Sequence, residues 1–169
     1  MDIQEAIFTR RSIRRFTGEA VDDKTLELVI KAGCQAPSAH NRQPWHFVVV
    51  RDEKLLKDIS EGHPYAKMLP QAGCAVIVCG DKELEGIPGF ITEDCSAAIE
   101  NMLLMAHGNG LGTVWCGIHP VGKLVKLFTK LLNLPEQILP VGMVVIGRPA
   151  AEASSVDRYD AARVHKETW

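Results

Sequence analysis

A short segment near the N-terminus concentrates side chains that are suited to bind an anion. Residues 10–16 read RRSIRRF. In extended backbone, Arg10, Ser12 and Arg14 point to the same side, because side chains alternate with a period of two. Two guanidinium groups and a hydroxyl on one side suit a phosphate or the polar edge of a heterocycle. A basic segment at a helix end is also commonly a solvated surface, so the motif alone leaves both interpretations open.

A second polar segment precedes a predicted buried strand, in APSAHNRQPWHFVVV at residues 36–50. Pro44 excludes a helix through its own position, and Gln43 before it is pushed toward extended backbone. The loop-forming residues are Pro37, Ser38 and Asn41. Residues 45–50 are apolar and rich in aromatic and β-branched side chains, which predicts a strand. The loop is either a site carried by a rigid element or an ordinary polar connection.

Helices and strands that must position these segments alternate along the chain. We predict helices over residues 2–9, from a cap at Asp22 to Gly33, in one or two short pieces within 52–70, from a cap at Thr92 to the HGNG at 107–110, and over 121–132. We predict strands over 45–50, 75–79, 112–117 and 143–147, followed by an irregular tail. This order indicates an α+β or α/β class, with helical layers around a mixed sheet.

One predicted helix is apolar on nearly every side. Residues 95–106 read CSAAIENMLLMA, so such a helix must be covered all round. It is either the central core helix of one small domain or a helix shared with a second subunit. The chain offers few other helices with which to cover it, which favours sharing.

Composition and charge restrict the class of protein. A chain of 169 residues with 46% apolar and 24% charged residues predicts one globular domain over 1–169. The net charge of −2 provides no basic surface for nucleic acid. We expect neither a membrane span nor secretion, because no long apolar run and no charged-then-apolar leader occurs. The five cysteines form no CxxC pair, which predicts reduced thiols in the cytoplasm. The histidines lack metal-ligand spacing, so no metal site is expected.

Four motifs in order carry a resemblance to a known family. They are RRSIR, then APSxxNxQPWHF, then ENMLLMA with GLGTVWCG, then VGMVVIGRP, and matching segments run from about residue 3 to the final HKETW. This combination resembles the nitroreductase family of flavin enzymes, and the chain length is similar to that of its shorter members. The resemblance implies a three-layer α+β fold with a mixed central sheet flanked by helices. It also implies a domain-sharing homodimer with FMN at the interface.

The resemblance assigns cofactor-binding roles by position. Arg10, Arg11, Ser12 and Arg14 would bind the ribityl phosphate and the pyrimidine edge of the flavin. Pro37, Ser38, Ala39, Asn41 and Gln43 of the other subunit would line the flavin and its ribityl chain. Trp115, Cys116 and Gly117 would lie beside the isoalloxazine, with backbone N–H groups near N5 and O4, and Arg158 would lie near the phosphate. For Cys116, a small buried thiol is commoner than a reactive one.

The activity that the resemblance implies is FMN-dependent NAD(P)H oxidation by a ping-pong mechanism. Hydride would pass from NAD(P)H to flavin N5, and an electron-poor acceptor of the nitroaromatic or quinone type would then take the electrons in the same cavity. No catalytic side chain is expected, because the flavin carries the chemistry. GLG at 110–112 lacks the spacing of a dinucleotide fingerprint, so NAD(P)H would bind only transiently. The alternatives are a non-catalytic FMN-binding carrier or redox-sensing module, and a scaffold without cofactor.

An acceptor pocket is expected over the open face of the flavin. We place it at the loops 60–70 and 85–91, because their Gly and Pro residues suit irregular, mobile segments. The residues expected to border it are His40, Arg42, Tyr65 and Phe90. For His40 and Arg42, simple solvent exposure is the competing interpretation.

Overall fold

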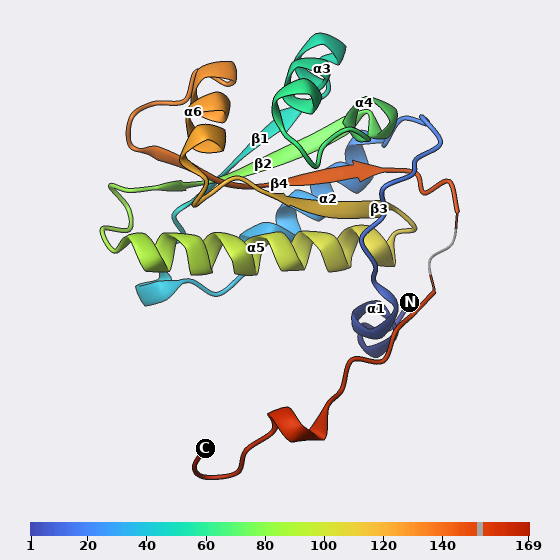
Figure 1. Cartoon of the computed structure of the whole chain (residues 1–169), viewed down its shortest axis with the longest axis vertical. Coiled ribbons are helices and arrows are strands. Elements are labelled where there is room, and N and C mark those ends of the chain that lie inside the picture. The colour runs from blue at the N-terminus through green and yellow to red at the C-terminus, as the bar shows by residue number, and fades with distance from the viewer. Residues whose placement is uncertain (152–153) are drawn as a thin grey trace.

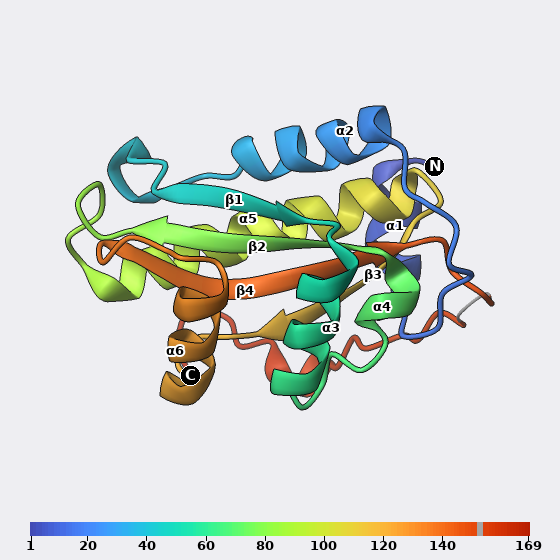
Figure 2. The ribbon, with the colours of Figure 1, turned by 90° about the horizontal axis from the view of Figure 1, so that it is seen from above.

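A central sheet lies between two layers of helices in the computed structural model, which describes residues 1–151 and 154–169 (Figures 1 and 2). The helices are α1 (Ile3–Thr9), α2 (Asp23–Cys34), α3 (Glu53–Gly62), α4 (Leu69–Ala72), α5 (Pro88–Gly108) and α6 (Gly122–Leu131). The strands are β1 (Trp45–Val50), β2 (Cys74–Asp81), β3 (Gly112–Gly117) and β4 (Ile138–Gly147). Two single 3-10 turns, η1 (Ala39–Asn41) and η2 (Ala161–Arg163), lie in the polar loop and in the tail. The α+β class with three layers is confirmed.

Side-chain alternation along the central strand β2 divides the interior into two cores. Val76 and Val78 belong to the core beneath α2 and α5, whereas Ile77 and Cys79 belong to the core beneath α3, α4 and α6. Figure 2 shows α2 and α5 on one face of the sheet and α3, α4 and α6 on the other. Successive residues of a strand point to opposite faces, so a strand buried on both sides is apolar throughout. This is why the apolar run around 75–79 was recognisable.

The four strands pair in the order β1-β2-β4-β3, and all three pairings are antiparallel. The prediction of a mixed sheet is therefore wrong for the four strands. Val50 at the end of β1 pairs with Ala75 at the start of β2, so the connection through α3 and α4 begins and ends at the same edge of the sheet. β2 therefore runs in the direction opposite to β1. Parallel pairing in the described residues is limited to the isolated bridge between Ser12 and Thr113.

The long helix α5 begins earlier than predicted. Ile87 precedes it and Pro88 is its first residue, a position that tolerates proline because its N–H has no helical partner. Thr92 is therefore not the cap: it lies one turn inside, where its hydroxyl donates to the Pro88 carbonyl at 3.4 Å. Phe90, expected in a loop, lies in the first turn of the helix.

Helix α5 is covered by its own chain where it packs on the sheet, α2 and the end of α1, and part of its surface stays open. Ala98, Ile99 and Met102 are fully buried in the core beneath the helix. The rest of its surface is more open, since Leu104 is half-buried and Met105 is 37% exposed. The buried side of α5 thus fits a core helix of one chain, and its open side leaves room for contact with a second subunit.

Apolar side chains also lie uncovered at both ends of the chain. Helix α1 has no buried residue, and its Phe8 is 72% exposed. The tail after residue 154 runs past α1 and away from the layers (Figure 1). Its Tyr159, Val164 and Trp169 are exposed. Apolar surface gathered in this way is typical of an interaction site.

Among residues 1–151 and 154–169, no helix combines the length and the apolar character that crossing a membrane requires.

Candidate functional site

The RRSIR segment is laid across one end of β3. Ser12 forms its bridge with Thr113, and the Ile13 N–H donates to the Thr113 carbonyl at 2.8 Å. A Cβ on Gly112 would lie 2.8 Å from Ile13 Cγ2, so a side chain at this position would push the segment away. At Gly147 in β4, a Cβ would likewise lie 2.8 Å from Phe16 Cδ1, so a side chain there would clash with the Phe16 ring. The two glycines let the segment approach the sheet closely.

Arg10, at the end of α1, is held against α5. Its Nε lies 3.2 Å from Glu100 Oε1. The preceding Thr9 hydroxyl donates to the Glu5 carbonyl at 2.6 Å and therefore accepts from His107 Nε2 at 2.7 Å. Burial lowers the pKa of His107, and the charge of Arg10 lowers it further. The end of α1 is thus fixed to α5 by an ion pair and a hydrogen bond.

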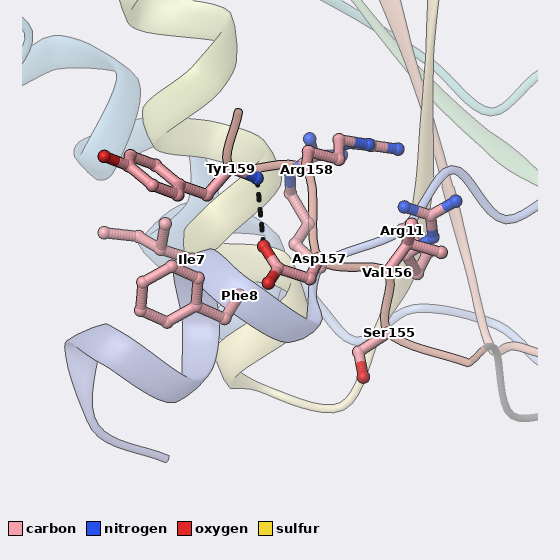
Figure 3. Close-up of a pocket in the computed structure, with 9 residues that line it drawn as sticks. Ile7, Phe8, Arg11, Ser155, Val156, Asp157, Arg158 and Tyr159 are labelled. Carbon is pink, nitrogen blue, oxygen red and sulfur yellow. Dashed lines mark hydrogen bonds between the residues drawn. The ribbon is translucent and has the colours of Figure 1, made fainter. Parts of the chain in front are cut away.

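Arginines from both ends of the chain line one cavity of about 580 Å³ (Figure 3). Its lining residues are Ile7, Phe8, Arg10, Arg11, Ser155, Val156, Asp157, Arg158 and Tyr159. In Figure 3, Arg11 and Arg158 extend on one side, whereas Ile7, Phe8 and Tyr159 gather on the other. One oxygen of the Asp157 carboxylate, Oδ1, accepts a hydrogen bond from the Tyr159 N–H at 2.9 Å and so stabilises a local turn. Three guanidinium groups and a serine hydroxyl are a donor set that fits a doubly charged phosphate.

The far end of β3 presents alternate residues to the two faces of the sheet. Trp115 and Gly117 are exposed, whereas Cys116 is buried in the core beneath α3, α4 and α6. Burial raises the pKa of the Cys116 thiol to about 11, although the nearby charge of Arg14 offsets part of this effect. Its Sγ lies 3.5 Å from the Tyr65 carbonyl oxygen. A protonated thiol in a core favours the packing interpretation of Cys116.

A smaller cavity of about 380 Å³ joins β3 to α5. It is lined by Thr92, Ser96, Trp115, Gly117, His119 and Val141. Thr92, Ser96 and Glu100 follow at intervals of four along α5 and so share one helix face. This face leads from Trp115 and Gly117 to the Glu100 that pairs with Arg10, over about 12 Å at the rise of a helix. Sequence reasoning missed the two hydroxyls and His119 because nothing in the pattern shows which helix face meets β3.

His63 is a further residue that the pattern did not single out. It is almost fully buried, and its Nδ1 accepts from the Tyr65 N–H at 3.2 Å. Its Nε2 therefore carries the proton and donates to the Gly117 carbonyl at 3.0 Å. His63 thereby fixes the backbone at the exposed end of β3.

The polar loop 37–43 adopts an unusual backbone. His40, Asn41 and Gln43 have φ angles of 51°, 54° and 49°, in the left-handed region that favours glycine. Ser38 Oγ accepts from the Gln43 N–H at 3.0 Å, and Gln43 Nε2 donates to Asn41 Oδ1 at 3.2 Å. Strained backbone of this kind persists only where surrounding contacts determine it.

Three of the four expected acceptor-pocket residues come together at this loop. The rings of His40 and Phe90 meet edge to face with centroids 6.3 Å apart. Arg42 lies beside the 82–87 segment, with Nη1 3.5 Å from the Leu84 carbonyl oxygen. Tyr65, which is 76% exposed, lies instead beside His63 and Cys116.

The polar loop and the RRSIR segment belong to separate parts of the molecule. Among the described residues, no hydrogen bond or ion pair joins loop 37–43 to residues 10–14. The segment contacts β3 and the middle of α5, whereas the loop contacts the start of α5 and the residues before it. The residues expected to surround one cofactor therefore lie in two separate groups on each chain.

Comparison with known proteins matches these observations. The sequence profile described as "Nitroreductase family" matches residues 7–62 and 61–148. A protein of Methanothermobacter thermautotrophicus with the provisional name NADH dehydrogenase/NAD(P)H nitroreductase is 43% identical over 169 residues, which span 100% of this chain and 88% of the relative.

Two solved structures share the fold over nearly their whole lengths. A crystal structure from Parabacteroides distasonis with the same provisional name superposes with a TM-score of 0.95 at 34% identity, covering 98% of both chains. A structure from Desulfovibrio desulfuricans, described as a provisional nitroreductase in complex with FMN, has a TM-score of 0.85 at 32% identity and covers 100% of this chain and 98% of its own. The motifs, the three-layer fold and the matches over most of the sequence agree: this chain belongs to the nitroreductase family.

Proposed function

We propose that the protein is an FMN-dependent NAD(P)H oxidoreductase in which residues 1–169 form one FMN-binding domain. The observation that carries this proposal is the cavity in which Arg10, Arg11 and Arg158 meet. Burying a phosphate with nearly two negative charges requires several cations, and arginine forks match its oxygens. The relative described with bound FMN, at 32% identity, supports the same ligand.

The chain's own residues bind and orient the cofactor in this proposal. Arg10, Arg11 and Arg158 would hold the phosphate, and Ser12 and Arg14 would bind the pyrimidine edge. The exposed end of β3, where Trp115 and Gly117 face outward, would hold the isoalloxazine, with the backbone of Cys116 contributing. Bound FMN supplies the hydride chemistry, so no acid or base among the side chains is needed.

We also propose that the site is completed by a second copy of the chain. Loop 37–43 of one protomer would line the cofactor held by the partner, through Pro37, Ser38, Ala39, Asn41 and Gln43. The separation of loop 37–43 from residues 10–14 within one chain supports this arrangement, as does the exposed apolar surface of α1 and the tail. A homodimer would cover that surface while bringing loop 37–43 of one chain to the arginine clamp of the other, which is Arg10, Arg11 and Arg158.

The order of events and the acceptor belong to the same proposal. The nicotinamide is expected to leave before an electron-poor acceptor, of the nitroaromatic or quinone type, enters the same cavity. We place His40, Arg42 and Phe90 at its border, because they already lie together beside the polar loop. Tyr65 is a separate candidate at the far end of β3. A cytoplasmic location remains part of the proposal, supported by the free state of all five cysteines.

An anaerobic titration distinguishes the enzyme from a carrier or sensor with bound flavin. Purified protein is expected to be yellow, to lose its flavin absorbance on addition of NADH or NADPH, and to regain it with a nitro compound or a quinone. A protein that holds flavin but is not reduced by either nucleotide would be a carrier or sensing module. A colourless protein that takes up no added FMN would contradict the proposal entirely.

A further inference from the structure

Two buried carboxylates outside the predicted site hold the strained polar loop. The first is Asp94 on α5, which is only 6% exposed. Its Oδ1 accepts from the Ala39 N–H at 2.9 Å. Ala39 is the first residue of η1, and the preceding Ser38 makes no side-chain cap. Asp94 therefore supplies, from a distant helix, the acceptor that the start of this turn lacks.

The second carboxylate holds the other end of the turn. Glu85 is fully buried, and its Oε1 accepts from the Ile87 N–H at 2.8 Å. The same oxygen lies 3.6 Å from Nη1 of Arg42, the residue that ends η1. The turn is thus held at its first residue by Asp94 and at Arg42, the residue directly after it, by Glu85.

Both carboxylates leave one oxygen without a partner. Among the described residues, Asp94 Oδ2 and Glu85 Oε2 are buried and make no hydrogen bond. Burying a charged group that is only partly bonded is unfavourable. An apolar side chain would avoid this cost, but it would leave the Ala39 N–H without its acceptor. The cost of Asp94 is therefore best accounted for by the shape that it imposes on residues 38–43.

We propose that Asp94 is a positioning residue for the cofactor: it holds loop 38–43 in the left-handed conformation that contacts FMN, with the Glu85–Arg42 pair as its counterpart at the other end. This inference rests on the proposed function, because it takes the loop to be a cofactor contact. Without the Asp94 acceptor, the Ala39 N–H has no partner and His40, Asn41 and Gln43 relax from their strained backbone. The protein then binds FMN less tightly although its two cores are untouched.

The test compares FMN affinity with the stability of the FMN-free protein in three variants. Asp94→Ala removes the acceptor, and Asp94→Asn retains an oxygen for Ala39 but removes the charge. Glu93→Gln is the matched control, since Glu93 is the exposed acidic neighbour on the same helix. Affinity is measured by quenching of free FMN fluorescence on titration, and stability by thermal unfolding after the flavin has been removed.

We expect Asp94→Ala to raise the FMN dissociation constant at least tenfold while the melting temperature of the FMN-free protein changes little. Asp94→Asn should restore the affinity to within about threefold of wild type, and Glu93→Gln should match wild type. An Asp94→Ala protein with wild-type affinity would overturn the inference and leave the proposed function intact. The inference also fails if Asp94→Ala shows no cooperative unfolding, because Asp94 would then be a residue of the fold. Wild-type protein that binds no FMN would overturn the proposed function and this inference with it.

Discussion

The main feature among single residues is a cavity in which three arginines from opposite ends of the sequence, Arg10, Arg11 and Arg158, meet. Arg10 is fixed by Glu100 of α5, whereas Arg158 arrives on the tail. The clamp is therefore partly preorganised and partly supplied by a segment that packs little against the body. A phosphate that neutralises all three arginines would also fix the tail in place.

Arg158→Ala should weaken FMN binding without affecting the fold. A charge-assisted hydrogen bond to phosphate contributes about 1.5 kcal/mol at its lower limit, or roughly a tenfold rise in the dissociation constant. Arg163→Ala is the matched control in the tail, because Arg163 is paired with Asp160 at 3.3 Å and lines no described cavity. Equal affinities of Arg158→Ala and wild type would remove Arg158 from the clamp.

His107 should make the stability of the protein depend on pH. Burial and the charge of Arg10 hold its pKa below the ordinary value of 6.5, so the unfolded chain takes up a proton before the folded one. The contribution of neutral His107 to the free energy of unfolding is fully present above about pH 6.5. It is lost as the pH falls from there through the lowered pKa of the folded state. His107→Gln should flatten that part of a profile of unfolding free energy against pH. A profile that keeps its slope in the variant would assign the dependence to other groups.

The chemistry of Arg10 and Arg14 predicted an anion site near the end of the first helix, although the same pattern also fits a solvated surface. Arg158 was assigned by the family resemblance alone, and the phosphate role of these arginines stays a prediction. Asp94 and Glu85 were not recognisable, because a carboxylate in the first turns of a helix or in a loop usually faces water. Only the packing shows that both are buried beneath the polar loop.

Among the helices, α5 contacts the polar loop, the far end of β3 and the end of α1. Asp94 holds the polar loop, Thr92 and Ser96 line the cavity at β3, and Glu100 and His107 hold the end of α1. Strands were predictable from continuous apolar runs, most clearly in β2, whose side chains are buried on both faces of the sheet. The early start of α5 and the antiparallel order of the sheet were not, because both depend on where the chain returns in space.

Substitutions on the two sides of α5 should have different effects. Met105→Glu places a charge at an exposed position, so the single chain should fold, but a dimer that covers this side should dissociate and release FMN. Ala98→Glu places the charge in the core of one chain, where it should prevent folding whatever the assembly. Circular dichroism and sedimentation separate the two effects. A folded Met105→Glu protein that remains dimeric would show that this side of α5 is not the interface.

For the molecule as a whole, we propose that one cofactor site is built from two chains. In each chain Arg10, Arg11 and Arg158 line one cavity, and among the described residues no hydrogen bond or ion pair joins residues 10–14 to loop 37–43. The apolar residues left exposed on α1 and the tail indicate where a second copy would pack. The sequence alone could raise this possibility through residues 95–106, but it could not show which side of the helix its own chain covers.

Mixing two defective chains tests that claim directly. One chain carries Arg10→Ala and Arg11→Ala in the clamp, the other Asn41→Ala and Gln43→Ala in the loop, and each homodimer should retain little FMN. Heterodimers are isolated through two different affinity tags, and their flavin content per dimer is measured. If clamp and loop come from different chains, the heterodimer has one intact site and should hold half the flavin of wild type. If each site lies within a single chain, both sites of the heterodimer are defective, and a flavin-free heterodimer would contradict the account.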